Sequence, residues 1–164
     1  MGTAPLNTGN GVGLPPDWVA INRKTGTLSA PSQTNLTTNY SFDAMRTPWR
    51  IALDYRWYKD PQAYTYLKKD YNFLSKEYEK NHKIVSSYSH NGKSISTIED
   101  PAMYAASLGY FDTVNKTLAK QIYNDKIIRL YSNDQNTFNP KLPYYEQNWL
   151  WFGTAFYNNF LSNF

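Results

Sequence analysis

Three dipeptides in which a polar residue precedes proline divide this chain into helical segments. They are Thr47-Pro48, Asp60-Pro61 and Asp100-Pro101. A Thr or Asp side chain accepts a hydrogen bond from a free N–H of the first helical turn, and proline is tolerated there because its missing N–H would have no helical partner. The connections between the expected helices are short, which favours antiparallel neighbours. The sequence therefore predicts an all-α fold, an antiparallel helical array with a short β-hairpin.

Apolar periodicity predicts one long, half-solvated helix after Asp60. Its stripe is formed, at intervals of three or four residues, by Ala63, Leu67, Tyr71, Leu74 and Tyr78. Residues spaced in this way share one face of a helix, and a surface helix buries that face against the core. The charged residues of the segment lie mostly off the stripe, as expected for an outer helix.

The second half of the chain predicts three further helices. We expect one over residues 102–108 that ends at Gly109, one that is capped by Asp112, and a last one over residues 144–161. The last segment is aromatic nearly all round, which indicates burial on most of its sides. Residues 133–143, which precede it, are rich in turn residues and are predicted to form a loop.

Two segments carry hairpin signals. Asn91-Gly92 is typical of a tight hairpin turn and lies between short runs at residues 84–88 and 94–96. A second possible hairpin joins residues 17–21 to residues 27–28. The first forty residues otherwise lack helical periodicity, so we expect a loop-rich lead-in over residues 1–40 and a helical body over residues 41–164, together forming a single domain.

The segment 42–58 combines charged side chains with large aromatic rings in a stretch that should be helical and largely buried. Buried charges need partners, because an unpaired ion is costly in an apolar site. On a helix, Asp43 can reach Arg46 at i,i+3 and Arg50 can reach Asp54 at i,i+4. Spacing alone favours a structural network of ion pairs.

Two helix starts are possible in this segment. Thr47-Pro48 has the better cap, whereas a start at Ser41 would leave Pro48 inside the helix and kink it. Either start places Asp43 at or near a helix N-terminus, where the helix dipole favours a negative charge. An ionised carboxylate in that position is suited to act as a base.

A family resemblance adds a second interpretation. Residues 42–50 read Phe-Asp-Ala-Met-Arg-Thr-Pro-Trp-Arg and resemble the Tyr-Asp-Ala-x-Arg-x-Pro-Trp-Arg segment of glycoside hydrolase family 8, which includes endoglucanases, chitosanases and lichenases. Residues 14–19 resemble the Pro-Asp-Trp stretch that precedes it. The resemblance implies an (α/α)6 barrel, with Asp43 as the general base of an inverting hydrolysis and Arg46 as the residue that holds it. Phe42 stands where the family usually has Tyr.

The resemblance also implies an incomplete catalytic pair. In the family the general acid is a Glu of the N-terminal half, on a stretch that this chain does not contain, and no such motif surrounds Glu77, Glu79, Glu99 or Glu146. Because an inverting glycosidase needs both carboxyl groups, we expect a fragment, the C-terminal part of the catalytic domain, that is inactive alone. The alternatives are a non-catalytic carbohydrate-binding remnant and a half-barrel that assembles with an N-terminal partner chain or with its own copies.

The expected substrate is a polysaccharide cut internally, a β-linked glucan, chitosan or exopolysaccharide. Phe42, Tyr144 and Tyr145 are candidate sugar platforms, because aromatic faces stack on the apolar faces of pyranoses. A structural role is favoured for Trp49 and Trp57.

Composition argues against several other classes. Without cysteine the chain has no disulfide and no Cys-based chemistry, and its two histidines lack carboxylates at ligand spacing, so we expect no metal and no cofactor. The net charge of +4 is scattered and forms no stripe that would bind nucleic acid. No apolar run is long enough to span a membrane. Residues 1–5 are not a signal peptide, yet the absence of cysteine and the many polar residues suit an exported protein, so we expect an extracellular or cell-surface location for the full-length form.

Overall fold

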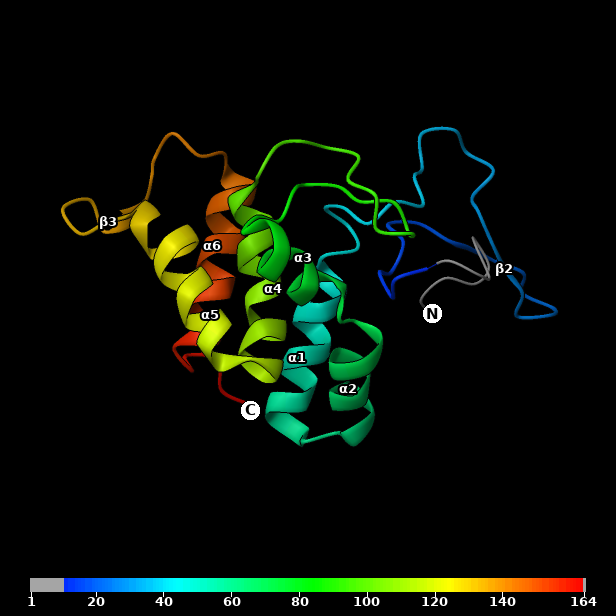
Figure 1. Cartoon of the computed structure of the whole chain (residues 1–164), viewed down its shortest axis with the longest axis horizontal. Helices are drawn as coiled ribbons and strands as arrows, with labels where there is room; N and C mark the ends of the chain where they lie inside the picture. Colours follow the sequence, from blue (N-terminus) through cyan, green and yellow to red (C-terminus); the bar gives the residue numbers. More distant parts are fainter. Residues whose placement is uncertain (1–10, 164) are drawn as a thin grey trace. The chain divides into compact units, whose positions relative to one another are not determined.

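The computed structural model describes residues 11–163 and divides into two compact units. Unit 1 comprises residues 11–47 and 68–99, and unit 2 comprises residues 48–67 and 100–163. Figure 1 shows the course of the chain, which is mainly helical with two short antiparallel strand pairs. None of the helices in the described part of the chain is long and apolar enough to cross a membrane.

Unit 1 contains the first strand pair and one α-helix. β1 (Ala20–Ile21) pairs with β2 (Leu28–Ser29), which confirms the possible hairpin near the N-terminus. Its connection is closed by the Asn22 side chain, whose Oδ1 accepts from the N–H of Lys24 at 2.9 Å. The helix is α3 (Phe73–Asn81).

Residues 84–99 of unit 1 form isolated bridges rather than the two strands that the Asn-Gly turn predicts. Tyr88 bridges to Ser94 and Val85 bridges to Glu99. The turn itself is present: Gly92 donates to the Ser89 carbonyl at 2.9 Å and has a φ of +84°.

Buried tyrosines form the centre of unit 1. Tyr40 and Tyr71 share a hydrogen bond of 2.5 Å between their hydroxyls, and Tyr88 packs edge-on against the Phe73 ring. The Tyr88 hydroxyl also accepts from the N–H of Val85. Burial raises the pKa of Tyr88 to about 12, so the phenol stays neutral.

The predicted long helix after Asp60 is interrupted. It consists of α2 (Pro61–Thr65), a π-helical turn η1 (Tyr66–Asp70) and, after a break, α3. At the break the Asn72 side chain donates to the Lys69 carbonyl at 2.7 Å. All five residues of the predicted stripe are nevertheless buried. Periodicity therefore identified the buried face correctly but not the continuity of the helix.

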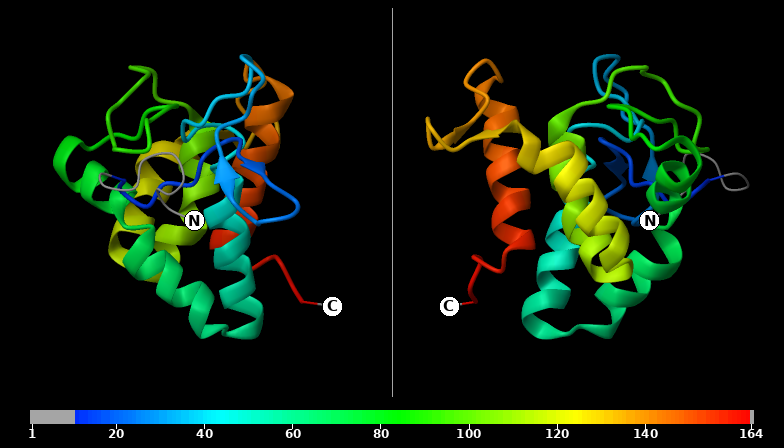
Figure 2. Two further views of the ribbon diagram at one scale, coloured as in Figure 1. Left: turned by 90° about the vertical axis from the view of Figure 1, so that its right-hand side faces the viewer. Right: turned by 60° about the vertical axis from the view of Figure 1, so that its left-hand side comes forward.

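Unit 2 holds most of the helical residues. α1 (Arg46–Tyr58) enters it from Pro48 onward, and α4 (Pro101–Val114) is buried along most of its length. α5 (Lys116–Ile122), the π-helical η2 (Tyr123–Ile127) and the 3₁₀ turn η3 (Ile128–Leu130) follow, and α6 (Tyr144–Tyr157) is the last helix. Figure 2 shows α4 beside α5 and α6.

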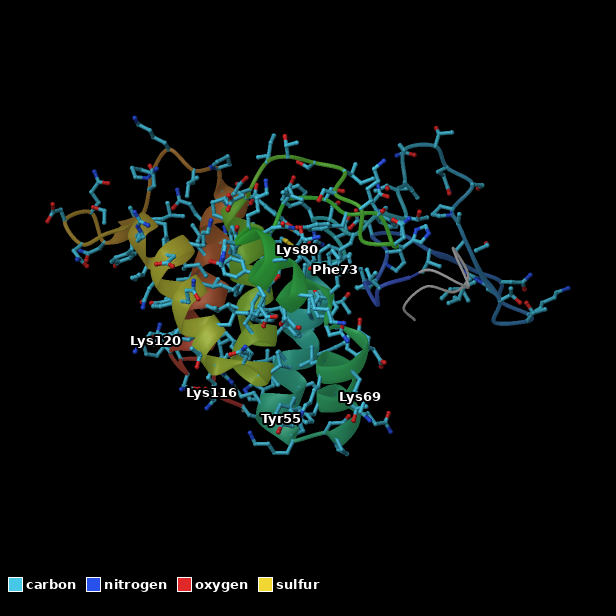
Figure 3. All side chains as sticks on the ribbon, viewed as in Figure 1. Tyr55, Lys69, Phe73, Lys80, Lys116 and Lys120 are labelled. Atoms are coloured by element: carbon cyan, nitrogen blue, oxygen red, sulfur yellow. The ribbon has the colours of Figure 1, made fainter. Side chains whose placement is uncertain are left out.

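The helices of unit 2 pack through small residues on one side and keep lysines on the other. A Cβ added at Gly153 of α6 would lie 2.6 Å from the Ala105 carbonyl oxygen of α4, so glycine is required for this close approach. On α5, Lys116 and Lys120 lie on the exposed side (Figure 3), whereas Leu118, Ala119 and Ile122 are buried.

Two predicted helix starts are confirmed and one is not. Asp60 and Asp100 each accept a hydrogen bond of 2.8 Å from the backbone N–H two residues later, with proline at the first helical position. α1 begins at Arg46, between the two predicted starts. Pro48 lies in its first turn, where the missing N–H interrupts no helical hydrogen bond.

The predicted boundary at Gly109 is wrong. α4 runs through Gly109 to Val114, so Asp112 lies inside the helix and does not cap the next one. A Cβ at Gly109 would lie 3.1 Å from the Ala52 Cβ, so this glycine serves packing rather than termination. The cap of α5 is Asn115, whose Oδ1 accepts from the N–H of Leu118.

The predicted loop over residues 133–143 contains part of a second hairpin. β3 (Tyr131–Ser132) pairs antiparallel with β4 (Thr137–Phe138). Each strand has two residues, too few to give a readable alternation of apolar and polar residues.

The last helix is shorter and more exposed than predicted. α6 ends at Tyr157 instead of residue 161. One of its sides is buried, through Leu150, Gly153, Ala155 and Phe156, but the Tyr144 side chain is 84% exposed and Trp151 is 56% exposed. An all-round aromatic sequence therefore does not mark all-round burial in this chain.

Candidate functional site

A hydrogen-bonded turn over residues 41–45 leads into α1, and Asp17 holds it. Oδ1 of Asp17 accepts from three backbone N–H groups, those of Ser41 at 2.9 Å, Asp43 at 3.2 Å and Ala44 at 2.8 Å. Its second oxygen accepts from the Ser41 hydroxyl. Hydrogen bonds to a charged acceptor are stronger than neutral ones, so the backbone on both sides of Asp43 is fixed.

Both carboxylate oxygens of Asp43 have partners within unit 1. Oδ1 lies 3.0 Å from Nη2 of Arg46, and Oδ2 accepts from the indole N–H of Trp18 at 3.1 Å. The predicted ion pair between Asp43 and Arg46 is therefore confirmed. Trp18 precedes Asp43 in the sequence and Arg46 follows it, and together their contacts restrict rotation of the carboxylate.

The Asp43 and Arg46 side chains are not largely buried, which corrects the sequence expectation. They are 39% and 38% exposed, so solvent reaches the carboxylate while its partners hold it. An exposed pair of this kind contributes little to stability by itself. The pair therefore fixes the direction of the Asp43 carboxylate and adds little to the stability of the fold.

Sequence reasoning missed Asp17 and Trp18 as members of this site. The available signal was the Pro-Asp-Trp stretch, which the sequence offered only as part of a family resemblance. The Trp18 side chain is 45% exposed. Its ring lies at the surface with the indole N–H on Asp43, so an apolar face and an anchored carboxylate occur together.

Phe42 lies next to Asp43 with 36% of its side chain exposed. It has no hydroxyl, so it provides only an aromatic surface at this position.

The second predicted ion pair is absent. Among the described residues no ion pair joins Arg50 to Asp54, and Arg50 is exposed. The least exposed arginine of α1 is Arg56, whose side chain is 17% exposed. Its Nη2 lies 2.6 Å from the Asp112 carboxylate of α4, and its guanidinium stacks 3.5 Å from the centre of the Phe156 ring.

Burial lowers the pKa of the Arg56 guanidinium, and the charge of Asp112 opposes that change. The Arg56–Asp112 pair lies in unit 2 and ties α1 to α4, while Arg56 also donates to the Phe156 carbonyl of α6. The sequence did not predict this pair, because Arg56 and Asp112 lie on different helices.

The two candidate tyrosines of α6 do not act as a pair. Tyr144 is almost fully exposed and lines a pocket with the β3–β4 hairpin, whereas the Tyr145 ring meets the edge of Trp149, with centroids 6.4 Å apart. Consecutive residues of a helix point to different sides, so a shared platform is not possible.

The part of the chain that the structure describes has no group of three or more His, Asp or Glu side chains that could hold a metal ion. The side chains beside the Asp43 carboxylate are the Arg46 guanidinium and the Trp18 ring, with the Phe42 ring next along the chain.

Residues 5–150 match the family described as glycosyl hydrolases family 8. The chain therefore belongs to glycoside hydrolase family 8, as residues 42–50 predicted, and is related to hydrolases that act on carbohydrates. It is 29% identical over 123 residues to endoglucanase A of Acetivibrio thermocellus, which covers 72% of this chain and 23% of that protein. It is 31% identical over 114 residues to endoglucanase C of Ruminiclostridium cellulolyticum, a match that covers 69% of this chain and 23% of that protein. The chain thus matches about a quarter of the length of these relatives.

Solved structures confirm the fold class. A beta-1,3-1,4-glucanase from Paenibacillus sp. X4 superimposes with a TM-score of 0.74 at 22% identity, over 94% of this chain and 39% of that chain. A cold-adapted family 8 xylanase gives a TM-score of 0.55 at 20% identity, over 78% of this chain and 31% of that chain. These neighbours are (α/α)6 barrel enzymes, so the helical array corresponds to part of such a barrel.

Proposed function

We propose that this chain carries the general base of an inverting glycoside hydrolase that cuts within a β-linked polysaccharide. The observation that carries the proposal is the Asp43 carboxylate, which is held through both oxygens yet remains 39% exposed. A general base must be fixed in direction and must also be reached by the water that it activates. Asp43 meets both conditions.

In the proposed reaction Asp43 removes a proton from water as the water attacks the anomeric carbon. The bond from that carbon to the glycosidic oxygen breaks, and a general acid protonates the departing oxygen. In inverting enzymes the two carboxyl groups stand roughly 6.5–9.5 Å apart to leave room for the water. Arg46 orients the Asp43 carboxylate, and the Trp18 N–H restrains its second oxygen.

The proposed acid lies on a stretch outside this chain. The chain aligns with only 23% of the length of its curated relatives, which supports a requirement for further sequence, for a partner chain or for a second copy. We therefore expect the chain alone to be inactive.

The names of the relatives support the proposed substrate class. Two of them are named endoglucanases, and the structural neighbours are a beta-1,3-1,4-glucanase and a xylanase. A β-linked glucan is the first candidate, with chitosan or an exopolysaccharide as others. Phe42, Tyr144 and Tyr145 remain candidate sugar contacts, Phe42 by its exposed ring beside Asp43. Such polymers are met outside the cell, so we place the full-length protein there or at the cell surface.

A second candidate function is saccharide binding without hydrolysis. The pocket beside Tyr144 favours it, because its lining is aromatic and amide-rich and has no charged side chain. This function would need neither Asp43 nor a general acid.

The release of reducing sugar from lichenan, carboxymethylcellulose and chitosan separates the two functions. The chain is assayed alone and together with the coding sequence upstream of it. Activity only in the extended form is the expected result. Inactivity of both forms toward all three polymers, with saccharide binding retained, would replace hydrolysis by binding.

A further inference from the structure

The turn at residues 89–92 of unit 1 places an asparagine side chain next to the backbone nitrogen of a glycine. Asn91 is exposed, and Gly92 follows it with a φ of +84°. Gly92 donates to the Ser89 carbonyl at 2.9 Å, which closes the turn. Because glycine has no Cβ, no side chain hinders the approach of its nitrogen to the amide of the preceding residue. The proposed hydrolysis at Asp43 does not use this turn.

Hydrogen bonds fix the direction of the Asn91 amide. Its Oδ1 accepts from the Ser89 hydroxyl and from the backbone N–H of Lys93 at 3.4 Å. A backbone N–H can only donate, so the atom that faces Lys93 is the oxygen, and the amide nitrogen Nδ2 points the other way. Nδ2 has no hydrogen-bond partner among the described residues. Asn91 therefore combines a polarised side-chain carbonyl with an amide nitrogen that is free to leave.

This arrangement is suited to the formation of a succinimide. The Gly92 nitrogen loses its proton and attacks Cγ of Asn91, the bond from Cγ to Nδ2 breaks, and Nδ2 leaves as ammonia with that proton. Negative charge develops on Oδ1 during the attack, where the donors of Ser89 and Lys93 stabilise it as in an oxyanion hole. Water then opens the ring at either of its two carbonyl carbons, which gives aspartate or isoaspartate. We propose that Asn91 undergoes this conversion without an enzyme, with water as the only co-reactant.

The fold slows the conversion without preventing it. The hydrogen bond from Gly92 to Ser89 must open first, because it holds the proton that the nitrogen loses. Exposed turns with few buried contacts open locally at a small cost in free energy. The reaction should therefore be slower at Asn91 than in an unstructured peptide of the same sequence, and faster than at exposed asparagines that precede larger residues.

Isoaspartate in this turn would alter the backbone that supports the candidate base. The main chain would run through the former side chain and become longer by one CH₂ group. Gly92 has little room for such a change, because a Cβ there would lie 2.7 Å from the Phe73 ring. The turn directly follows Tyr88, whose backbone exchanges hydrogen bonds of 2.8 and 3.0 Å with that of Tyr40, just before the turn that carries Asp43. We expect isoaspartate to weaken this backbone bridge.

The test is peptide mapping of the whole chain after incubation at mildly alkaline pH. Trypsin releases residues 84–93 as one peptide, in which Asn91 is the only asparagine. We expect this peptide to gain the mass difference between an amide and an acid, and to accept a methyl group from protein isoaspartyl methyltransferase. Asn35, an exposed asparagine of unit 1 that precedes Leu36, is the matched control and should not change.

Asn91→Gln separates the modification from its consequence. Glutamine keeps the amide but would have to close a larger ring, so residues 84–93 should not change in mass. After incubation, the amides of Tyr40 and Tyr88 should exchange hydrogen at least about tenfold faster in the unaltered chain, but not in Asn91→Gln. Asn10-Gly11, the other Asn-Gly step of the sequence, begins outside the described residues and is present in both forms, so it does not affect the comparison.

Two results would overturn the proposal. The first is an unchanged mass of residues 84–93 under conditions that convert a synthetic peptide of that sequence. The second is a gain in mass without methyl transfer, because direct hydrolysis of the amide would give aspartate alone. Unchanged exchange at Tyr40 and Tyr88 after full conversion would contradict the effect on the backbone bridge. None of these measurements depends on hydrolysis of a polysaccharide, so the proposal and the proposed function fail separately.

Discussion

Asp17 is the residue on which the position of Asp43 depends most. Its carboxylate accepts hydrogen bonds from three backbone N–H groups of the turn before α1, and Asp17→Ala would leave these groups without that partner. Hydrogen bonds to a charged group contribute about 1.5–3 kcal/mol each, so amide hydrogen exchange at Asp43 and Ala44 should accelerate at least about tenfold. Asp17→Asn keeps one oxygen and should have a smaller effect.

Hydrogen exchange measured by NMR checks this ordering. Asp134→Ala, at an exposed aspartate of unit 2, is the control and should leave both amides unchanged. Equal exchange rates in Asp17→Ala and the unaltered chain would show that the turn does not depend on Asp17.

Arg56 and Arg50 offer a matched comparison on one helix. Arg56→Ala leaves the Asp112 carboxylate, 21% exposed, without its ion pair, and should lower the free energy of unfolding by about 1–3 kcal/mol. Arg50→Ala removes an exposed arginine that has no ion pair among the described residues, and should change it by less than about 0.5 kcal/mol. Urea denaturation measures both, and equal midpoints for the two variants would contradict the structural role of Arg56.

These residues show which contacts the sequence could predict. The pair of Asp43 with Arg46 is local, so helical spacing was sufficient. The contacts of Asp43 with Trp18 and of Arg56 with Asp112 join residues 25 and 56 positions apart, and no periodicity records them. The choice of Arg50 rather than Arg56 failed for the same reason, because the partner of Arg56 lies on another helix.

At the scale of elements, the approach of α6 to α4 depends on Gly153. Alanine is the better helix former by about 1 kcal/mol, yet its Cβ would lie 2.6 Å from the Ala105 carbonyl oxygen. Gly153→Ala should therefore destabilise unit 2 by about 1–3 kcal/mol. A Cβ at Gly109 would meet side-chain atoms at 3.1 Å, so Gly109→Ala should lower the free energy of unfolding by less. Thermal unfolding followed by circular dichroism compares them, and a rise in melting temperature for Gly153→Ala would refute the close contact.

The cap of α4 predicts a pH dependence. Burial raises the pKa of Asp100 above its usual value of 3.8, and the charge of Glu146 adds to this, while the hydrogen bond from Ala102 opposes it. The folded state therefore binds this proton more tightly than the unfolded state, so the contribution of Asp100 to stability falls as the pH rises above 3.8.

Asp100→Asn keeps a capping oxygen and removes the titration. Unfolding curves across the acid range should show that the variant gains stability relative to the unaltered chain as the pH rises. Asp60→Asn, at the other aspartate that caps a helix before proline, gives the matched comparison. A difference between Asp100→Asn and the unaltered chain that does not change with pH would contradict this account.

Helix starts were predictable from the sequence where a cap and a proline occur together, as at Asp60 and Asp100. Helix ends were not predictable in the same way. Gly109 suggested a helix end, but glycine is needed there because Ala52 and Phe156 leave little space for a Cβ, not because the backbone turns. The π-helical turns η1 and η2 also carry no signal in apolar periodicity, since the buried stripe continues across the first of them.

At the scale of the whole molecule, the family and its fold class were predictable from one nine-residue motif, and the range of the match, residues 5–150, confirms them. Catalytic competence was not, because hydrolysis needs a second carboxyl group. The chain matches 39% of the length of the glucanase neighbour and about a quarter of the length of the endoglucanases, so the proposed activity is one that we expect only with further sequence.

The most direct test of the central claim is the turnover number on lichenan of the chain expressed with its upstream coding sequence, compared with the Asp43→Asn form. Removal of a general base should lower the turnover number at least about a hundredfold without changing the affinity for glucan. Asp125→Asn, at an exposed aspartate, is the control and should leave the turnover number unchanged. Turnover of the Asp43→Asn form that equals the unaltered rate would show that Asp43 is not the base.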